Sequence, residues 1–424
     1  MILKEKLAVK FEQEKADIAA FVKEHGSKKV SEVTLAQAYG GLRGVKGLVC
    51  DTSEVPPDKG LIIRGIELGK ITDKYPEEIL WLLLTGELPN EAEMKEIQGE
   101  LQARCEVPDY VWKVLEAMPK DSHPMAMFNT AILVMQRESE FAKAYAEGIK
   151  KPDYWKPTLE DTLNIIAKLP AIGAYVYRLR FDKGPRIEPD KNADWGQNFA
   201  RMLGLPDPNG ELSKLMRLYL TLHCDHEGGN VSAYSAATVS SALSDLYYSL
   251  SAGLNGLAGP LHGLANQECL GWVLETIEKF GGVPTVEQIT QYTWDTLNAG
   301  KVIPGYGHAV LRVTDPRFTA FLAFGKQHCA EDTVFKTVSN VFDAVPEVLK
   351  QISKISNPWP NVDAGSGSLL YHYGMTEFSY YTVLFSISRA LGICSQAVVA
   401  RAMGYAITRP KSLPTNKFKE LVGA

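Results

Sequence analysis

"YYTVLFSISRALGICSQAVVARAMG", residues 380–404, is the stretch that decides the fold. It is apolar on every face of a helix, yet it carries Arg389 near its middle. A charge at that depth would be costly in a lipid bilayer, so we expect a central helix of a large helical core, surrounded by protein. A buried guanidinium without a counter-charge is strongly unfavourable. Arg389 therefore needs an anionic partner, either a structural Asp or Glu or the carboxylate of a ligand.

Helical periodicity continues along the rest of the chain. Residues 241–260 are apolar enough for a second core helix, and residues 75–105 have the pattern of two helices joined by a Gly-Glu-Leu-Pro turn. Residues 158–180 are a further amphipathic segment. The fold class that this pattern predicts is all-α.

Three local features refine this prediction. Thr158 and Asp161 have the spacing of a cap that begins a helix, and Pro170 is expected to bend or interrupt the helix that follows. The segments 47–53 and 60–65 flank a proline-containing turn and predict a small N-terminal β-hairpin. The first 26 residues predict an amphipathic helix with one apolar stripe, formed by Leu3, Leu7, Phe11, Ile18, Phe21 and Val22.

The composition is that of an ordinary globular protein. Of 424 residues, 45% are hydrophobic and 22% are charged, and the net charge of −5 comes without a basic cluster. We therefore expect no nucleic-acid partner and no membrane partner. Six cysteines lie far apart without a Cys-x-x-Cys pair, as in buried thiols of a reducing compartment. The N-terminus alternates Lys and Glu without the pattern of a presequence. This favours a bacterial cytoplasm over the mitochondrial matrix.

Four glycine- and proline-rich elements carry most of the candidate chemistry. They are HCDHEGGNVS at 223–232, GLAGPLHGLANQE at 256–268, VIPGYGHAVLR at 302–312 and NPWPNVDAGSGS at 357–368. Glycines let the chain approach a ligand closely, and helix breakers place side chains at helix ends, where backbone dipoles act on them. Four such elements, each with a titratable residue, are hard to explain as turns alone.

Several common reaction classes do not fit these elements. HEGGN at 226–230 is a near miss of the zinc motif His-Glu-x-x-His, with Asn230 where the second histidine belongs. The sequence has no Gly-x-Ser-x-Gly elbow, and the GSGS of residues 365–368 lacks the strand-to-helix context that an elbow needs. P-loop and Gly-x-Gly-x-x-Gly spacings are also missing. A metallohydrolase, a serine hydrolase and a nucleotide site of those types are therefore disfavoured.

Proton chemistry next to a carbonyl group fits better. Such a site needs a carboxylate base, a neutral donor to the forming enolate oxygen, and cations that hold an acidic substrate. Asp363 is the candidate base. His262 follows a Gly-Pro pair and is expected at a helix N-terminus, where the dipole lowers its pKa and keeps the imidazole neutral. The arginines available to bind carboxylates are Arg317, Arg389 and Arg409.

These elements, in this order and spacing, resemble those of citrate synthase. GPLHGLANQE, PGYGHAVLR and NPWPNVDA together form a highly specific signature, and the likeness runs from GGLRGVKGLV to ITRPKS. The branch it resembles is the one shared by mitochondrial enzymes and some bacteria. The resemblance implies condensation of acetyl-CoA with oxaloacetate and water to citrate and CoA, through a citryl-CoA intermediate. It implies no metal and no cofactor, because the CoA thioester is a substrate.

The resemblance also implies roles by position. Asp363 would remove the acetyl α-proton, His262 would hydrogen-bond the thioester oxygen, and His308 would polarise the oxaloacetate ketone. The residues implied for oxaloacetate binding are His226, Asn230, Arg317, Phe385, Arg389 and, across a dimer interface, Arg409. In HCDHE, His223 is a rival for the place of His226. The residues implied for CoA binding are Lys143, Tyr306, Gly307, Ala309, Arg312 and Asn361.

The implied architecture has a large helical domain, residues 1–265 and 375–424, with a smaller helical domain, residues 266–374, inserted between its two parts. The implied site lies in the cleft between the domains, and the cleft closes over oxaloacetate before the enol forms. A homodimer is implied, because Arg409 enters the site of the other subunit.

Several positions depart from the family pattern. Lys143 replaces an arginine of many relatives and Ser356 replaces a lysine, which weakens or removes two phosphate contacts. Gly365 and Tyr234 stand where histidine is common. Gly365 follows closely on the candidate base, and we expect the room it leaves to admit a bulkier acyl chain. 2-Methylcitrate synthase, with propionyl-CoA as donor, is therefore the alternative activity, since one methylene is worth only about 1–3 kcal/mol in a hydrophobic pocket.

A helical scaffold that binds partners through its grooves is an alternative of a different class. It would share the composition and the buried helices. It would not require Asp363, His262, His308 and buried arginines together in one place.

Overall fold

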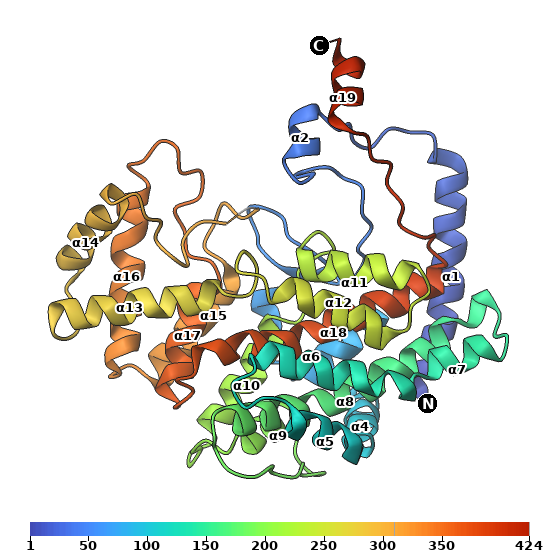
Figure 1. Cartoon of the computed structure of the whole chain (residues 1–424), viewed down its shortest axis with the longest axis horizontal. Coiled ribbons are helices and arrows are strands. Elements are labelled where there is room, and N and C mark those ends of the chain that lie inside the picture. The colour runs from blue at the N-terminus through green and yellow to red at the C-terminus, as the bar shows by residue number, and fades with distance from the viewer. Residues whose placement is uncertain (309, 424) are drawn as a thin grey trace.

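The computed structural model describes residues 1–308 and 310–423, and helices dominate it (Figure 1). In chain order the α-helices are α1 Ile2–His25, α2 Leu35–Tyr39, α3 Pro76–Thr85, α4 Glu91–Ala103, α5 Asp109–Ala117, α6 Pro124–Val134, α7 Glu140–Ala146, α8 Trp155–Arg180, α9 Trp195–Leu203, α10 Glu211–Leu222, α11 Val231–Ser241, α12 Leu246–Leu257, α13 Ala265–Phe280, α14 Val286–Asn298, α15 Pro316–His328, α16 Thr333–Leu349, α17 Asp363–His372, α18 Tyr381–Met403 and α19 Thr415–Val422. The 3-10 helices are η1 Leu68–Lys70, η2 Met135–Glu138, η3 Lys151–Asp153 and η4 Phe378–Tyr380, and the strands are β1 Ser53–Glu54, β2 Ile62–Ile63 and β3 Ile66–Glu67. The predicted all-α fold with one small β element is confirmed.

Helix α18 runs through the middle of the molecule (Figure 1). By length and composition the segment Phe378–Met403 could span a membrane, but 83% of its most apolar window is buried inside the protein. Helices α3, α8, α10, α11 and α12 pack around it. α18 is therefore apolar on every face because other helices surround it, as predicted.

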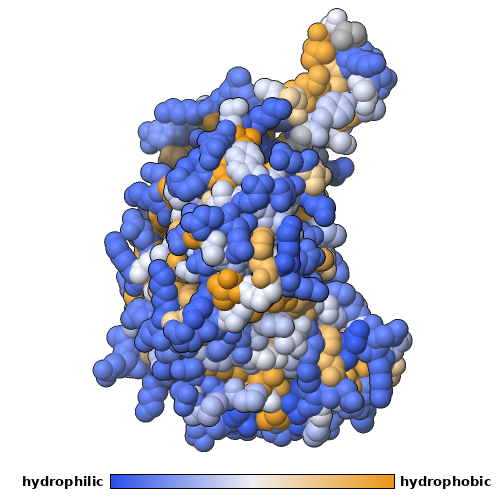
Figure 2. Space-filling view, turned by 90° about the vertical axis from the view of Figure 1, so that its left-hand side faces the viewer, coloured by the Kyte–Doolittle hydropathy of each residue, from blue (hydrophilic) through white to orange (hydrophobic). Residues whose placement is uncertain are grey.

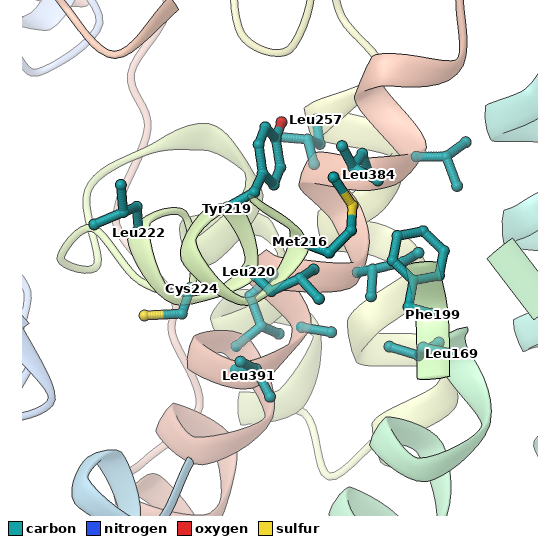
Figure 3. Packing of buried hydrophobic residues seen from close by; sticks show 14 of the residues in the cluster. Leu169, Phe199, Met216, Tyr219, Leu220, Leu222, Cys224, Leu257, Leu384 and Leu391 are labelled. Carbon is teal, nitrogen blue, oxygen red and sulfur yellow. The ribbon is translucent and has the colours of Figure 1, made fainter. Parts of the chain in front are cut away.

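The contact between α10 and α18 illustrates how this core is filled. Met216 and Leu220 of α10 lie close to Leu384 and Leu391 of α18, with Phe199 of α9 beside them (Figure 3). All five side chains are buried. Each such burial is worth roughly 1.5–3 kcal/mol. The loop after α10 and the middle of α18 both carry site residues, so this packing sets their relative position.

Pro170 does not interrupt its helix. α8 runs from Trp155 to Arg180 with Pro170 inside it. A proline at this place removes the N–H that would bond to the carbonyl of Ile166. The indole N–H of Trp195 donates to that carbonyl instead, at 2.9 Å. The expected interruption is wrong because a side chain distant in sequence satisfies the freed carbonyl.

The Thr158/Asp161 pattern is not a helix cap. α8 starts earlier, at Trp155, and the Thr158 hydroxyl donates to the carbonyl of Tyr154. Asp161 accepts hydrogen bonds from the Ser139 hydroxyl at 2.8 Å and from two backbone N–H groups at the start of α7. The carboxylate thus serves another helix through a tertiary contact.

The β element has three strands. β1 pairs antiparallel with β2, as the predicted hairpin requires, and β2 pairs antiparallel with β3. Arg64 and Gly65 join β2 to β3 with φ of 47° and 79°. Two successive positive φ values are the conformation of a type I′ turn. The sequence did not reveal β3, because a two-residue strand has no periodicity to read.

The apolar stripe of α1 is only half buried. Leu3, Leu7 and Phe11 are in the core, but Phe21 and Val22 are 64% and 55% exposed. The predicted helix is present, and the second half of its apolar stripe is not covered by the rest of this chain. In Figure 1 that half extends beyond the body of the molecule.

The segment after α1 and the C-terminal segment also extend outward. α2 and α19 lie together outside the body (Figure 1), where the rings of Tyr39 and Phe418 are 5.9 Å apart. Figure 2 shows this part as a narrow projection with apolar side chains on it. Residues 26–49 and 405–423 thus form a pair of arms with little of the protein around them.

Helices α13 to α17 form a separate group at one side of the molecule (Figure 1). α13 packs on α16 and α17, α14 on α16, and α15 on α17. These helices fall within the residues predicted for a smaller inserted domain, and the boundaries at 266 and 374 stay a prediction.

Candidate active site

The four glycine- and proline-rich elements converge beside α18. The first links α10 to α11, the second links α12 to α13, the third precedes α15, and the fourth contains the start of α17. The ring centroids of His226 and His308 are 5.6 Å apart, and those of His262 and Phe385 are 6.1 Å apart. The Arg389 guanidinium lies 4.7 Å from the Phe385 ring centroid. The fold thus brings together side chains that are far apart in sequence.

His262 meets a helix N-terminus, but not that of the helix that follows it. α13 begins three residues after His262, at Ala265. The Nε2 atom lies 3.3 Å from the N–H of Ser232, in the first turn of α11, and 3.0 Å from the Ser232 hydroxyl. Since a backbone N–H can only donate, Nε2 is the acceptor, and this contact assigns the ring proton to Nδ1.

The protonation state of His262 follows from its surroundings. Burial, and then the charge of Arg389, lower the pKa of His262 to about 4. The imidazole is therefore neutral near pH 7. Among the described residues its Nδ1–H has no hydrogen-bond partner, so this group can donate to a ligand oxygen.

His308 has the opposite tautomer. The N–H groups of Val310 and Leu311 donate to its Nδ1 atom at 3.0 and 2.9 Å. The ring proton is therefore assigned to Nε2. Burial, and then the charge of Arg317, lower the pKa of His308 to about 4. The site thus holds two neutral imidazoles, each with one N–H to offer.

Asp363 is the first residue of α17. Its N–H donates to the Asn361 side-chain oxygen at 2.9 Å. Burial raises the pKa of Asp363 to about 6, although the charge of Arg317 acts in the other direction. A carboxylate with this pKa is mostly ionised at pH 7 and accepts a proton more readily than an ordinary aspartate does.

Arg389 is 1% exposed and, within the described parts of the chain, no carboxylate lies within salt-bridge distance of it. Its Nε–H donates to the carbonyl of His223 at 3.1 Å, and a terminal N–H donates to the Asn230 side-chain oxygen at 3.3 Å. Burial lowers its pKa to about 10. The charge of the buried Asp225 acts in the other direction, although Asp225 lies beyond salt-bridge distance. Of the two anionic partners expected from the sequence, a structural carboxylate is therefore present only at longer range, which leaves a direct carboxylate contact to a ligand.

Arg317 already has a carboxylate partner. Its Nη2 atom lies 2.6 Å from Oδ2 of Asp315, and its Nε atom lies 3.0 Å from Oδ1. Both side chains are buried, and the pair sits at the N-terminus of α15. This pair orients the guanidinium, and its Nη1 atom has no partner among the residues that the structure describes.

His226 and His223 differ in what they contact. The Nε2 atom of His226 is buried and has no hydrogen-bond partner in the described part of the chain. Burial, and then the charges of Arg317 and Arg389, lower the pKa of His226 well below its ordinary value. His223 is stacked on Tyr219 at 4.1 Å and its Nδ1 atom lies 3.1 Å from the carbonyl of that residue. His223 therefore belongs to the core, and His226 retains an unused polar atom.

Asn230 holds the first element in shape. Its side-chain oxygen accepts from the N–H of Ala233 at the start of α11, and its Nδ2 group donates to the carbonyl of His226 at 2.9 Å. The same oxygen accepts from Ser232 and Arg389. Asn230 thus joins three residues of the site through one amide.

The third and fourth elements are bound to each other. Tyr306 pairs with Pro360 in an isolated β-bridge, and the Asn361 side chain donates to the carbonyl of Gly307 at 3.0 Å. Arg312 is exposed and donates to carbonyl groups of its own loop. Ala309, also predicted for CoA, lies outside the described residues. This pairing places His308 and the start of α17 on one surface.

Two predicted residues do not join this group. Lys143 is 53% exposed on α7 and pairs with Glu140 at 2.9 Å. In Figure 1 α7 lies on the opposite side of the molecule from α13 to α17. Arg409 is exposed in the C-terminal arm. Neither residue is brought to the site within its own chain.

Two residues that the sequence reasoning did not name belong to the site. Ser232 fixes the tautomer of His262, and Asp315 orients Arg317. Asp315 had a signal, because an aspartate followed by a proline is typical of a helix start. Ser232 had none, since its partner lies 30 residues away.

Gly365 does not widen the site. A side chain there would meet Phe318 at 3.1 Å and Phe321 at 3.5 Å, which are packed between α17 and α15. The expected room for a bulkier acyl group is therefore wrong, because this position faces the interior. Across residues 1–308 and 310–423, no three His, Cys, Asp or Glu side chains are grouped to hold a metal ion.

Chemically, this arrangement combines a raised-pKa carboxylate, two neutral imidazole donors and two buried arginines, one of which has no carboxylate within salt-bridge distance among the described residues. Such a site can bind a dicarboxylate, remove a weakly acidic proton from carbon, and donate hydrogen bonds to two oxygens.

Comparisons with known proteins agree with this chemistry. The sequence model of the family described as "Citrate synthase, C-terminal domain" matches residues 41–411. The mitochondrial citrate synthase of Saccharomyces cerevisiae is 50% identical over 430 residues, covering 99% of this chain and 89% of that protein. The mitochondrial 2-methylcitrate synthase of Yarrowia lipolytica is 48% identical over 432 residues, covering 99% and 93%. The crystal structure of the citrate synthase of Pyrobaculum aerophilum superposes with a TM-score of 0.78 at 27% identity, covering 91% and 95%.

The comparisons overturn the expectation of a bacterial cytoplasm. The relatives from both yeasts are named as mitochondrial. The prediction rested on the first residues of the sequence, and these say nothing of a segment that is removed from a mature chain.

Proposed function

This chain belongs to the citrate synthase family, and from that premise we propose how its cleft condenses acetyl-CoA with oxaloacetate and water to give citrate and CoA. The single observation that carries the assignment of roles is the combination of Asp363, with its pKa raised to about 6, and His262, whose pKa is lowered by burial and Arg389 and whose tautomer is fixed by Ser232. The chemistry is routed through side chains alone, with the CoA thioester as substrate.

Oxaloacetate binds first in this proposal. Its carboxylates are held by Arg389, which has no carboxylate within salt-bridge distance in the described chain, and by the Nη1 end of Arg317, which Asp315 orients. His226 and Phe385 line the same place, and the Nε2–H of His308 donates to the ketone oxygen. Binding a dianion next to two buried guanidinium groups removes the desolvation penalty of Arg389.

Acetyl-CoA then reacts beside it. Asp363 takes a proton from the methyl carbon while the Nδ1–H of His262 donates to the thioester oxygen, which stabilises the enol. The enol carbon attacks the ketone carbon of oxaloacetate, and His308 donates to the oxygen on which charge develops. Water then cleaves the thioester of citryl-CoA, which releases citrate and CoA.

The rest of the CoA molecule is placed by the third and fourth elements. We assign its binding to Tyr306, Gly307, Arg312 and Asn361 of one chain. Lys143 would reach CoA only from another subunit, because its own cleft lies on the far side of the molecule.

A second copy of this chain is the proposed partner. Residues 47–52 and helices α11, α12 and α18 line a groove of about 230 Å³ beneath the arms. The exposed apolar residues Phe21, Val22, Ile407 and Leu421 lie on or next to the same arms. A homodimer would cover these side chains and carry the exposed Arg409 into the partner's cleft, where a third cation would face oxaloacetate.

The test of the assignment is thiol release from acetyl-CoA with and without oxaloacetate. Asp363→Ala is expected to lower kcat by at least about 100-fold, since a general base contributes roughly 10²–10⁴. Asp295→Ala, at an exposed position on α14, is the matched control and should match the wild type. Turnover by Asp363→Ala at the wild-type rate would overturn the proposal.

Propionyl-CoA remains the alternative donor, because a 2-methylcitrate synthase is 48% identical to this chain. The ratio of kcat/KM for acetyl-CoA and propionyl-CoA decides between the two. A higher value for propionyl-CoA would make 2-methylcitrate the main product.

A further inference from the structure

The sequence DAGSGS, residues 363–368, contains a motif that the proposed chemistry does not use beyond its first residue. The segment forms the first turns of α17, and Ala364, Gly365, Ser366, Gly367 and Ser368 are all buried. Two glycines at the start of a helix weaken it by roughly 1 kcal/mol each relative to alanine. Gly365 and Gly367 are needed because α17 packs closely on its neighbours at both positions.

Both glycines let α17 lie close to its neighbours. A Cβ at Gly365 would be 3.1 Å from the Phe318 ring of α15. A Cβ at Gly367 would be 2.3 Å from the side-chain oxygen of Asn266 on α13. A side chain at Gly367 would force Asn266 or the helix itself to move.

The serine between these glycines makes one hydrogen bond across the interface. The Asn266 side-chain N–H donates to the Ser366 hydroxyl at 2.5 Å, and the two residues are 5% and 0% exposed. Asn266 lies four residues after His262 in sequence, and Ser366 lies three residues after Asp363 in α17. The bond therefore joins the segment that carries the imidazole to the helix that carries the carboxylate.

The segment around His262 is fixed on its other side as well. The Gln267 side chain donates to the Thr382 hydroxyl at 3.1 Å, and Thr382 donates to the carbonyl of Gly263 at 3.1 Å. Thr382 is on α18, the helix of Phe385 and Arg389. α13 is thus tied to the oxaloacetate side of the site by Gln267 and to α17 by Asn266.

We propose that Asn266 and Ser366 are a positioning pair: their hydrogen bond fixes the distance between Asp363 and His262. The carboxylate and the imidazole can then act on the same acetyl group. This rests on the proposed roles of those two residues. A misplacement of about 1 Å in a catalytic group can cost about 100-fold in rate. Asn266 and Ser366 are buried between α13 and α17, so we expect oxaloacetate binding to stay intact when their bond is broken.

The experiment compares Ser366→Ala with Ser368→Ala. Both serines are buried on α17, but the Ser368 hydroxyl donates to the carbonyl of Gly365 within its own helix, at 2.8 Å. Ser366→Ala is expected to lower kcat by at least about 10-fold with the KM for oxaloacetate within about 2-fold of wild type. Ser368→Ala is expected to keep kcat within about 2-fold, because it leaves the bond between the two helices in place.

A second readout separates positioning from a general loss of stability. With methyl-deuterated acetyl-CoA, Ser366→Ala should show a larger isotope effect on kcat than wild type, because proton removal by a displaced Asp363 becomes slower. Asn266→Ala should show the same, and the double variant should be no slower than the slower single variant, since the pair acts as one unit. Gly367→Ala, which pushes on Asn266, provides the same readouts if Ser366→Ala does not fold.

The proposal is overturned if folded Ser366→Ala equals Ser368→Ala in kcat and isotope effect, or if the effects of the Asn266 and Ser366 variants multiply. Asp363→Ala distinguishes a failure of the positioning pair from a failure of the proposed function. An inactive Asp363→Ala with a fully active Ser366→Ala rejects only the positioning pair, whereas an active Asp363→Ala rejects the proposed function itself.

Discussion

At the scale of single residues, the site is governed by burial of ionisable groups. Burial raises the pKa of Asp363 and lowers those of His262 and His308, so each moves toward its neutral form. The same burial leaves Arg389 without a carboxylate within salt-bridge distance in the described chain, since Asp225 acts on it only from farther away. These residues are costly to the fold and useful to the reaction, because a dianionic substrate supplies the missing charge.

The pH dependence of the reaction should follow Asp363. The base acts only when ionised, so kcat/KM for acetyl-CoA should fall about tenfold per pH unit below about pH 6, the pKa to which burial raises this carboxylate. His262 and His308, with pKa values of about 4, titrate too low to cause this limb. A rate profile between pH 5 and 8 measures it, and a plateau down to pH 5 would contradict the assignment.

The binding of oxaloacetate to Arg389 should be visible in thermal unfolding. Oxaloacetate at 100 times its Kd should stabilise the wild type by about 2.7 kcal/mol and raise its Tm. Arg389→Gln should lose this rise, because it removes the guanidinium that we assign to the oxaloacetate carboxylates. Arg137→Gln, at a position that is 73% exposed, is the control and should keep the rise. A destabilised Arg389→Gln that still responds to oxaloacetate would show that the arginine has only a structural role.

At the scale of elements, helices in this protein are joined by single side chains reaching across long sequence distances. The indole N–H of Trp195 donates to the carbonyl that Pro170 frees in α8. The backbone N–H of Trp195 donates to Glu77 of α3 at 2.7 Å. Three helices, α3, α8 and α9, therefore meet at one residue. Glu77 is 2% exposed, and its second carboxylate oxygen has no partner among the described residues.

This junction predicts a pH-dependent stability. Burial raises the pKa of Glu77 to about 7 in the folded protein, from an ordinary value of 4.5. The protonated form is favoured on folding, so this contribution is fully present below about pH 4.5 and is lost as the pH rises through about 7. Glu77→Gln keeps the accepting oxygen and removes the ionisation. Its free energy of unfolding should exceed that of the wild type by a margin that grows between pH 5 and 8, toward an upper limit of about 3 kcal/mol. Tm measured across this pH range checks the trend, and a difference in Tm that does not change with pH would contradict the prediction.

At the scale of the whole molecule, the arms lie outside the body of the chain, and Arg409 on one of them is exposed. Helix α1 turns its second half outward, and α2 and α19 contact each other away from the body. A second copy of the chain would provide a surface for α1, α2 and α19 to pack against. The cleft would then be built from two chains.

A hybrid dimer tests this arrangement. Asp363→Ala and Arg409→Ala subunits should each form inactive or nearly inactive homodimers. Co-expressed with different tags and purified as the mixed dimer, they should show about half of the wild-type activity, because one of the two clefts then has its own Asp363 and the partner's Arg409. If Arg409 served its own chain, both clefts of the hybrid would be defective and no activity would return.

The sequence by itself determined the helical class, the central core helix and the residues around which the site is built. Those inferences depend on local patterns, since periodicity reports which face is buried and short motifs identify His262, His308 and Asp363. Predictions from the sequence were wrong where a polar group forms its hydrogen bond with a residue distant in the chain. Trp195 keeps Pro170 within a continuous helix, Asp161 serves another helix, and Ser232 rather than the following helix meets His262.

Only the tertiary structure decided which charges have partners. It gave Arg317 a carboxylate and left Arg389 without one within salt-bridge distance in the described chain. It also turned Gly365 toward a packed interior and sent Arg409 outward. The physical reason is that burial and pairing depend on the three-dimensional neighbours of a side chain, and no local pattern of residues encodes what lies across a helix interface.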